Sequence, residues 1–334
     1  MYEPFFSTTQ KYWLDFLISR VNKKPKIIFT DGSDSRIIEA SYFLLKKTSI
    51  QPILIGDSAK IYHQAYSLGK SLDGVEIYSF LEPQYSSEWS NFLLSNSKLT
   101  LLKDSLLENS LAFGSFLLKI GVGQGLIAGA SVSTGEVIKR LLSIVGVDSR
   151  TPLVTSSFVM IHPNSDFASN GLAIFSDCGV IPEPTEEQLF EITLRAQRLM
   201  MDLFNISPRT ALLSFSSSGS STHPAALKMR HLKERLKAYD PAMEIAGEIQ
   251  FDAAADARIR QQKGLSGDLQ DNANVYIFPN LDSGNIGYKI MQHTSGSLAL
   301  GPLLQGFPVR VSDLSRGCTV EDIVLTSLVT ACQS

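Results

Sequence analysis

The sequence has few cysteines and no long hydrophobic run. Its three cysteines, Cys178, Cys318 and Cys332, are too scattered for a disulfide framework, and no CxxC pair suggests a zinc site. The longest apolar stretch, Leu111 to Val132, contains Lys119, Gln124 and several glycines, so a buried helix followed by a buried strand explains it better than a membrane span. The first twenty residues also lack the features of a signal peptide. These absences favour a soluble, cytoplasmic protein that is not held by a membrane, by disulfides or by a metal.

An excess of positive charge is also missing. The chain has 30 Lys and Arg against 33 Asp and Glu, for a formal net charge of −3, which gives no general attraction to nucleic acid or to an anionic membrane. The composition, 44% hydrophobic and 19% charged, is that of an ordinary globular protein. A length of 334 residues indicates two domains. Because the net charge is slightly negative, an anionic ligand would need a local cluster of donors.

Short apolar runs alternate with amphipathic segments along almost the whole chain. The runs that predict strands are Lys26 to Thr30, Gln51 to Ile55, Gly125 to Ala130, Pro152 to Phe158, Leu172 to Ser176, Ala211 to Ser216, Glu244 to Phe251 and Asn274 to Phe278. Amphipathic segments such as Ser35 to Lys47, Thr185 to Phe204 and Ala225 to Lys237 predict helices between them. Several runs are continuously apolar, as in parallel strands covered on both faces. The pattern predicts a doubly wound α/β fold.

In such folds ligands bind beyond the carboxyl ends of the strands, so the polar residues that follow each strand are candidates. Asp31 to Arg36 follows the first predicted strand; we favour a capped turn there over a ligand site, since neither a GxGxxG nor a P-loop motif is present. Asp177 follows another strand. It could accept a proton, or it could satisfy the backbone donors of its loop.

Two further candidates lie in the second half of the chain. The turn from Ser214 to Thr222, which contains Ser216, could cradle an anion at a helix start or be a plain turn. Asn285 and Lys289 are four residues apart, which would direct an amide and an ammonium at one point, or simply form an exposed polar face.

The densest group of polar residues precedes the C-terminal helix, and consists of Ser315, Arg316, Gly317, Cys318 and Asp322. Arg316 offers a planar fork suited to phosphate or carboxylate, and Gly317 permits close approach of the backbone. Asp322 could instead be only the N3 partner of a capping box that begins at Thr319. Cys318 has no histidine nearby in sequence, which makes it a weak candidate nucleophile.

Six ordered blocks of sequence now point to a family. The blocks "IFSDCGVIPEPTEEQL", "ALLSFSSSGSS", "GEIQFDAA", "NVYIFPNLDSGNIGYKI", "GPLLQG" and "SDLSRGCTVEDIV" resemble, in order and spacing, the phosphate acetyltransferase (phosphotransacetylase) family within the acetyl/butyryl phosphate transferases. The resemblance implies two three-layer α/β/α domains with mainly parallel sheets and a cleft between them, similar to isocitrate and isopropylmalate dehydrogenases. Residues 1–150 with about 295–334 would form the first domain, and 151–294 the second.

The resemblance also implies a reaction and its participants. A cytoplasmic homodimer would interconvert acetyl-CoA and phosphate with CoA and acetyl phosphate, with coenzyme A as a substrate and no tightly bound cofactor or metal. Asp322 would be the general base on the CoA thiol, Ser315 would hydrogen-bond the reacting centre, and Arg316 would hold the phosphoryl group and stabilise charge on the carbonyl oxygen. Cys318 would lie near the site without being the nucleophile.

The sequence departs from the family pattern where basic residues are expected. In "STGEVIKRLL", Lys139 stands where the family usually has an arginine, with Arg140 next to it, and the turn around Ser216 lacks the usual lysine. The implied substrate-binding residues are therefore Lys139, Arg140, Asn285, Lys289, Ser216, Gly317 and Cys318. The alternatives are a phosphate butyryltransferase, another short-chain acyltransferase, or a catalytically weakened protein that binds CoA or acyl phosphate.

Overall fold

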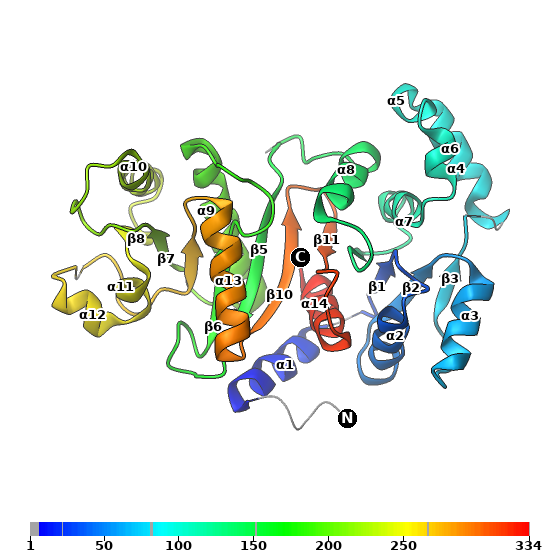
Figure 1. Ribbon diagram of the computed structural model, residues 1–334, viewed down its shortest axis with the longest axis horizontal. Coiled ribbons are helices and arrows are strands. Elements are labelled where there is room, and N and C mark those ends of the chain that lie inside the picture. The colour runs from blue at the N-terminus through cyan, green and yellow to red at the C-terminus, as the bar shows by residue number, and fades with distance from the viewer. Residues whose placement is uncertain (1–6, 22, 81–82, 151, 266, 334) are drawn as a thin grey trace. The chain divides into compact units, whose positions relative to one another are not determined.

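The computed structural model describes residues 7–21, 23–80, 83–150, 152–265 and 267–333, and is drawn in Figure 1. Packing divides the chain into two compact units. Unit 1 comprises Met1–Asp15, Leu153–Gln305 and Gln333–Ser334, and unit 2 comprises Phe16–Pro152 and Gly306–Cys332. Helix α1 (Thr8–Arg20) contains the first boundary between them. The domain limits expected from the sequence stay a prediction.

Unit 2 is built on a parallel sheet of five strands in the order β3-β2-β1-β4-β11. Its elements are β1 (Lys26–Phe29), α2 (Ser35–Lys47), β2 (Gln51–Ile55), α3 (Ser58–Ser67), β3 (Glu76–Tyr78), α4 (Pro83–Ser95), α5 (Ser97–Thr100), α6 (Lys103–Leu107), α7 (Ser110–Lys119), β4 (Gly125–Ala128), α8 (Thr134–Ile144), β11 (Arg310–Asp313) and α14 (Val320–Cys332). The carboxyl ends of β1, β4 and β11 are therefore neighbours at one edge of this sheet.

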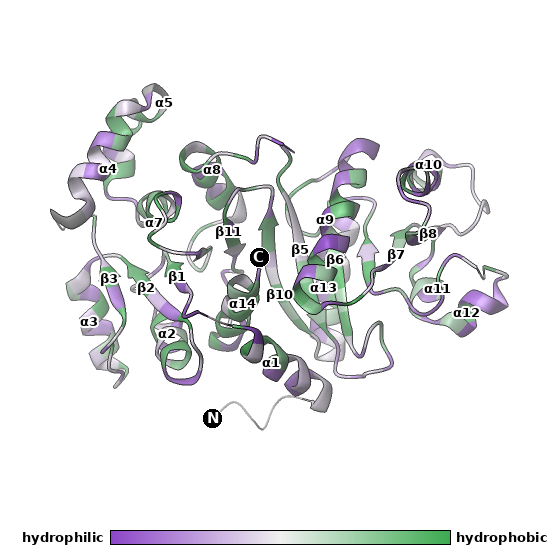
Figure 2. Cartoon of the chain, turned by 180° about the vertical axis from the view of Figure 1, so that it is seen from behind, coloured by the Kyte–Doolittle hydropathy of each residue, from purple (hydrophilic) through white to green (hydrophobic). Residues whose placement is uncertain are grey.

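Helices cover both faces of the unit 2 sheet. Helix α2 packs against α14, and α7 packs against α8, with the strands between the two pairs in Figure 1. Helix α14 has eight consecutive buried residues, and Figure 2 shows it largely in the hydrophobic colour. All four residues of β4 are buried. The stretch from residue 111 to 132 is thus a buried helix, α7, followed by a buried strand, β4, as its sequence predicts.

Unit 1 is built on six strands in the order β10-β5-β6-β9-β7-β8. Its elements are β5 (Thr155–Ile161), β6 (Leu172–Ser176), α9 (Glu186–Phe204), β7 (Arg209–Leu213), α10 (Pro224–Tyr239), β8 (Glu244–Ile249), α11 (Phe251–Ala255), α12 (Ala257–Gln262), β9 (Val275–Ile277), α13 (Leu281–Ser295) and β10 (Leu298–Gln305). Strands β6, β9, β7 and β8 pair in parallel, whereas β5 pairs antiparallel with both β10 and β6.

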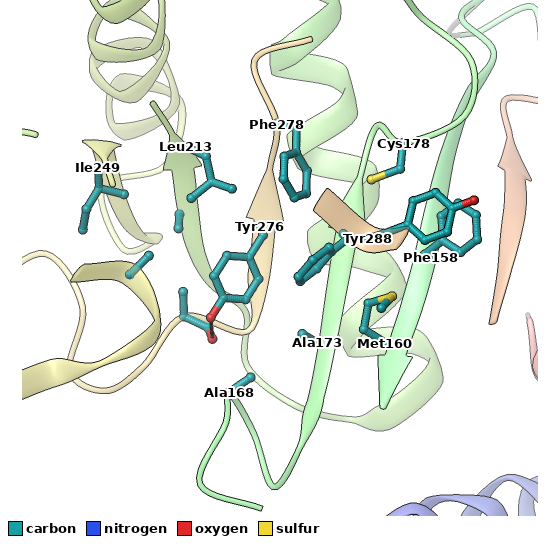
Figure 3. Packing of buried hydrophobic residues seen from close by; sticks show 14 of the residues in the cluster. Phe158, Met160, Ala168, Ala173, Cys178, Leu213, Ile249, Tyr276, Phe278 and Tyr288 are labelled. Carbon is teal, nitrogen blue, oxygen red and sulfur yellow. Dashed lines mark hydrogen bonds between the residues drawn. The ribbon is translucent and has the colours of Figure 1, made fainter. Parts of the chain in front are cut away.

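A core of aromatic and small side chains lies between the unit 1 strands and helices α11 and α13 (Figure 3). The ring of Tyr288 on α13 stacks on Phe158 of β5, with ring centroids 4.1 Å apart. Tyr276 of β9 is fully buried and donates from Oη to the backbone oxygen of Ala273 at 2.9 Å. Because its hydroxyl has an acceptor, Tyr276 can be buried in the core. The stacking of Tyr288 on Phe158 fixes helix α13, which carries Asn285 and Lys289.

The α/β class with mainly parallel pairing, predicted from the sequence, is confirmed. Strands β2 and β6 and helix α2 have the predicted bounds, but the strand predicted from Pro152 lies three residues later, at Thr155–Ile161. Strands β3, β10 and β11 were not predicted. Among the described residues, no helix is both long and apolar enough to cross a membrane.

Candidate active site

The polar loop of residues 314–319 joins β11 to α14 in unit 2. Its start is fixed to the sheet, because the Leu314 N–H donates to the Ala128 oxygen at 2.8 Å. The Cys318 N–H then closes a turn onto the Ser315 oxygen at 2.9 Å. Ser315, Arg316 and Gly317 are exposed in this turn, whereas Cys318 is buried. The loop thus presents a hydroxyl and a guanidinium to solvent from a closed turn.

Asp322 forms the capping box that the sequence predicts. The Thr319 N–H donates to Asp322 Oδ2 at 2.9 Å, and the Asp322 N–H donates to Thr319 Oγ1 at 3.1 Å. Asp322 Oδ1 takes no part in either bond. The half-buried carboxylate therefore holds the first turn of α14 with one oxygen, which leaves the other oxygen for a second role.

The buried thiol of Cys318 is not set up as a nucleophile. Burial raises the pKa of Cys318 to about 11, although the nearby Arg36 guanidinium acts in the opposite direction. A thiol with this pKa is protonated at neutral pH, and the thiolate is the reactive form. The structure therefore supports the interpretation that Cys318 is packed within the loop.

Arg36 contacts this loop from the first turn of α2, and the sequence did not reveal that contact. Its Nη1 donates to the backbone oxygens of Arg316 at 2.8 Å and Cys318 at 3.0 Å. Asp34 caps α2, as the expected turn requires, by accepting from the Arg36 N–H at 2.9 Å. Burial opposes ionisation of Asp34, but the hydrogen bonds from Arg36 outweigh it and lower the pKa of Asp34. The segment after β1 is thus both a capped turn and a support of the polar loop.

Asp313 is a second residue that sequence reasoning missed. It ends β11 directly before the loop and is completely buried. Thr134 Oγ1, at the start of α8, donates to Asp313 Oδ2, whereas Oδ1 has no hydrogen-bond partner among the described residues. Burial raises the pKa of Asp313 to about 7, and the nearby charge of Asp31 acts in the same direction. The residue type alone gave no signal, because the burial arises only when β11 lies beside β4.

The two basic residues of α8 have different surroundings. Lys139 is exposed. Arg140 is only 14% exposed and forms an ion pair with Glu136, one helical turn earlier, at 2.7 Å. The Arg140 guanidinium is thus already neutralised, so Lys139 is the more accessible of the two cations.

The Ser216 turn, in unit 1, does hold an anion, but the anion is a carboxylate of the protein itself. Glu248 Oε1 accepts hydrogen bonds from Ser216 Oγ at 3.1 Å and from the Gly219 N–H at 2.8 Å. Arg230 donates to both oxygens of the same carboxylate at 3.0 Å. Burial alone would raise the pKa of Glu248, but the hydrogen bonds from Arg230, Gly219 and Ser216 lower it to about 2. The donors of this turn are thus occupied by Glu248, and a substrate at Ser216 would compete with that carboxylate.

The remaining candidates in unit 1 also have partners within the protein. Asn285 Nδ2 donates to the Cys178 oxygen at 3.0 Å, while the exposed Lys289 lies over the Tyr288 ring, with Nζ 5.3 Å from its centroid. Asp177 accepts from three successive backbone N–H groups of its loop, at residues 179–181, and from Ser156 Oγ. The carboxylate of Asp177 therefore satisfies loop donors, which is one of the two readings left open by the sequence.

In the part of the chain that the structure describes, no group of three or more His, Cys, Asp and Glu side chains could hold a metal ion. The predicted residues of unit 2 form one continuous group around the loop, because β11, α14 and α2 bring together Ser315, Arg316, Gly317, Cys318 and Asp322 with Arg36. Lys139 and Arg140 lie on α8, whose first residue is bonded to Asp313. Asn285, Lys289 and Ser216 belong to unit 1.

Comparisons with known proteins agree with the fold. The family model described as "Phosphate acetyl/butaryl transferase" matches residues 14–331. The phosphate acetyltransferase of Clostridium acetobutylicum is 34% identical over 318 residues, which cover 93% of this chain and 95% of that protein. The solved structure of a phosphotransacetylase from Streptococcus pyogenes has a TM-score of 0.85 and 31% identity, and covers 96% of this chain and 98% of its own.

More distant structures share the fold alone. A branched-chain phosphotransacylase from Enterococcus faecalis has a TM-score of 0.71 at 17% identity, covering 92% of this chain and 98% of its own. A 4-hydroxythreonine-4-phosphate dehydrogenase from Burkholderia phymatum has a TM-score of 0.50 at 11% identity, covering 93% and 99%. Because the family model matches residues 14–331 and a relative is 34% identical over 93% of this chain, the protein is an α/β enzyme of the phosphate acyltransferase class. It belongs to the phosphate acetyl/butyryl transferase family.

Proposed function

We propose that this enzyme transfers an acetyl group reversibly between coenzyme A and inorganic phosphate. The observation that carries the proposal is the loop after β11, which presents exposed Ser315 and Arg316 next to Asp322 on the first turn of α14. Relatives named as phosphate acetyltransferases match almost the whole chain, which supports acetyl as the acyl group. A homodimer in the cytoplasm is part of the same proposal, and light scattering of the purified protein tests the dimer.

In the proposed reaction Asp322 accepts the proton of the CoA thiol. The free thiol has a pKa of ~8.5, so a positioned base increases the thiolate fraction near neutral pH. The thiolate attacks the carbonyl carbon of acetyl phosphate, the bond from that carbon to the bridging oxygen breaks, and phosphate leaves with the electron pair. In the opposite direction phosphate attacks the thioester, and Asp322 returns the proton to the departing thiolate.

Ser315 and Arg316 act on the reacting groups in this proposal. The guanidinium of Arg316 can hold the phosphoryl group through two parallel hydrogen bonds and stabilise the charge that develops on the carbonyl oxygen. The Ser315 hydroxyl can donate to the same centre. Lys139 and Lys289 are exposed cations that we propose as further contacts for the anionic substrates, together with Gly317, Asn285 and Ser216.

Release of free thiol from acetyl-CoA in the presence of phosphate tests the proposal directly. We expect release by the wild type and at least ~100-fold slower turnover by Asp322→Asn, because a positioned general base contributes roughly 10²–10⁴-fold. The thermal midpoint should change little, since an asparagine oxygen can still accept from the Thr319 N–H. Asp104→Asn is the matched control, because Asp104 is an exposed carboxylate in the first turn of α6.

The same assay separates the alternatives. Faster release from butyryl-CoA than from acetyl-CoA would favour a phosphate butyryltransferase. If neither thioester is cleaved at high enzyme concentration but CoA binds in calorimetry, the protein is a binding module and the proposed activity is wrong. A large fall in the thermal midpoint of Asp322→Asn with unchanged turnover would show that Asp322 acts only as a helix cap.

A further inference from the structure

Every N–H group of the Arg36 guanidinium has an acceptor. The guanidinium carries five N–H donors in a fixed plane. Nε and Nη2 donate to the two carboxylate oxygens of Asp34 at 3.0 and 2.7 Å, and Nη2 donates also to the Ala130 oxygen at 3.0 Å. Nη1 donates to the oxygens of Arg316 and Cys318 at 2.8 and 3.0 Å. Nη1 also lies within hydrogen-bond distance of Cys318 Sγ, at 3.6 Å. Five donors thus meet five oxygen acceptors and one sulfur from three separate segments.

The pair with Asp34 does not by itself explain this arrangement. The same Asp-x-Arg fork occurs at Asp256 and Arg258, where Nε and Nη2 donate to the carboxylate at 3.2 and 2.7 Å, and the arginine side chain is 88% exposed. The Arg36 side chain is only 27% exposed. The difference comes from the backbone oxygens of residues 130, 316 and 318, which surround the far side of the Arg36 guanidinium.

The three segments that Arg36 joins follow neighbouring parallel strands. Asp34 follows β1, Ala130 follows β4, and residues 316 and 318 follow β11. The two loop oxygens lie on either side of Gly317, the most permissive residue of the turn. Arg36 therefore fixes the 316–317 and 318–319 peptide groups, and the N–H of the peptide between them is bonded to the Ser315 oxygen. The exposed side chains of Ser315 and Arg316 then leave the loop in defined directions.

We propose that Arg36 is a positioning residue for the reaction, which holds the 315–318 loop so that Ser315 and Arg316 meet the substrate in a productive geometry. The inference rests on the proposed function, since that function assigns the reacting groups to this loop. Displacing such groups by about 1 Å can cost on the order of 100-fold in rate. Lysine cannot replace Arg36, because its ammonium has three donors and no planar fork.

The experiment compares Arg36→Lys and Arg36→Gln with Arg258→Gln, which breaks the matched fork in unit 1. Amide hydrogen exchange of a peptide covering residues 314–319 reports on the loop, and steady-state thiol release reports on the reaction. We expect faster exchange of that peptide and a kcat lower by on the order of 100-fold in both Arg36 variants, with KM for CoA changed less than about threefold. Arg258→Gln should leave both measurements unchanged.

Several outcomes would overturn the inference. Unchanged exchange of the 314–319 peptide in Arg36→Lys would show that Arg36 does not hold the loop. Faster exchange with unchanged kcat would show that the hydrogen bonds from Arg36 to the loop have no catalytic consequence. If Arg36→Gln does not fold, Arg36→Lys, which keeps the charge beside Asp34, decides the question. Should the wild type release no thiol, the proposed function and its catalytic consequence both fail, while the exchange measurement still decides whether Arg36 holds the loop.

Discussion

We expect Asp313 to make the free energy of unfolding fall as the pH rises, which is opposite to the effect of most carboxylates. The side chain is completely buried at the end of β11, where Thr134 Oγ1 donates to Oδ2. The Cα of Gly129 lies so close to Oδ1 that an added Cβ would stand 2.0 Å from this oxygen. Water is thereby excluded from the carboxylate, and burial raises the pKa of Asp313 from its ordinary 3.8 to about 7.

The sign and size of the effect follow from these two pKa values. Between pH 3.8 and 7 the folded protein keeps the proton of Asp313 while the unfolded chain releases it, so the free energy of unfolding falls as pH rises through this window. At 1.36 kcal/mol per pKa unit, the full loss is roughly 4 kcal/mol. About 3 kcal/mol of this loss falls between pH 5 and pH 8.5.

Asp313→Asn removes the ionisation and keeps an oxygen that can accept from Thr134. We expect the difference in unfolding free energy between this variant and the wild type to increase, in favour of the variant, by about 3 kcal/mol from pH 5 to pH 8.5. Urea unfolding at a series of pH values measures it, with Asp73→Asn, an exposed loop position, as the control. The unpaired amide group that the substitution introduces adds a constant offset, which cancels in the comparison. Parallel pH profiles for the variant and the wild type would refute the reasoning.

Three further changes test the charges of the site through the thiol-release assay. Arg316→Ala should lower kcat by roughly 100- to 1000-fold, as expected for a lost donor at an oxyanion. The thermal midpoint of the protein should change little, because Arg316 is exposed. A loss of kcat below threefold would contradict the proposed role of Arg316. Lys139→Arg should lower KM for phosphate or CoA through bidentate geometry, and an unchanged KM would remove Lys139 from the site. Glu136→Gln should release Arg140 from its ion pair and also lower KM for phosphate; an unchanged KM would show that Arg140 is structural.

Local patterns in the sequence predicted those elements whose determinants are local. Continuous apolar runs with clear turn residues gave β2 and β6 their bounds, and the capping box at Thr319 formed as expected. Strand β10 escaped prediction because it contains Gly301 and Pro302, and its register with β5 shifts at that point. Proline removes a ladder donor, so only the pairing on both sides of the irregularity makes this segment a strand.

The same distinction between local and distant contacts applies to the residues of the candidate site. The residues of the loop after β11 could be proposed from the sequence because they are contiguous and chemically distinctive. The partners of the loop could not, because Arg36 lies 280 residues before the carbonyl of Arg316 that it contacts. Glu248 likewise lies 32 residues from Ser216, so the sequence could not show that the carboxylate bound by this turn comes from the protein itself.

These internal pairs show how a chain with almost balanced charge could direct an anionic substrate to the proposed site. Arg36 is bonded to Asp34, Arg140 to Glu136, and Arg230 to Glu248, so each of these three guanidinium groups has its charge compensated within its own unit. Compensated arginines position backbone and attract a free anion weakly, because the neighbouring carboxylate cancels most of the field. In the proposed function, the attraction for phosphate in unit 2 comes from the exposed Lys139 and Arg316, and Arg316 stands beside the N-terminus of α14, where the helix dipole adds to its charge. An anionic substrate would then be attracted to the loop to which the proposed function assigns the reacting groups.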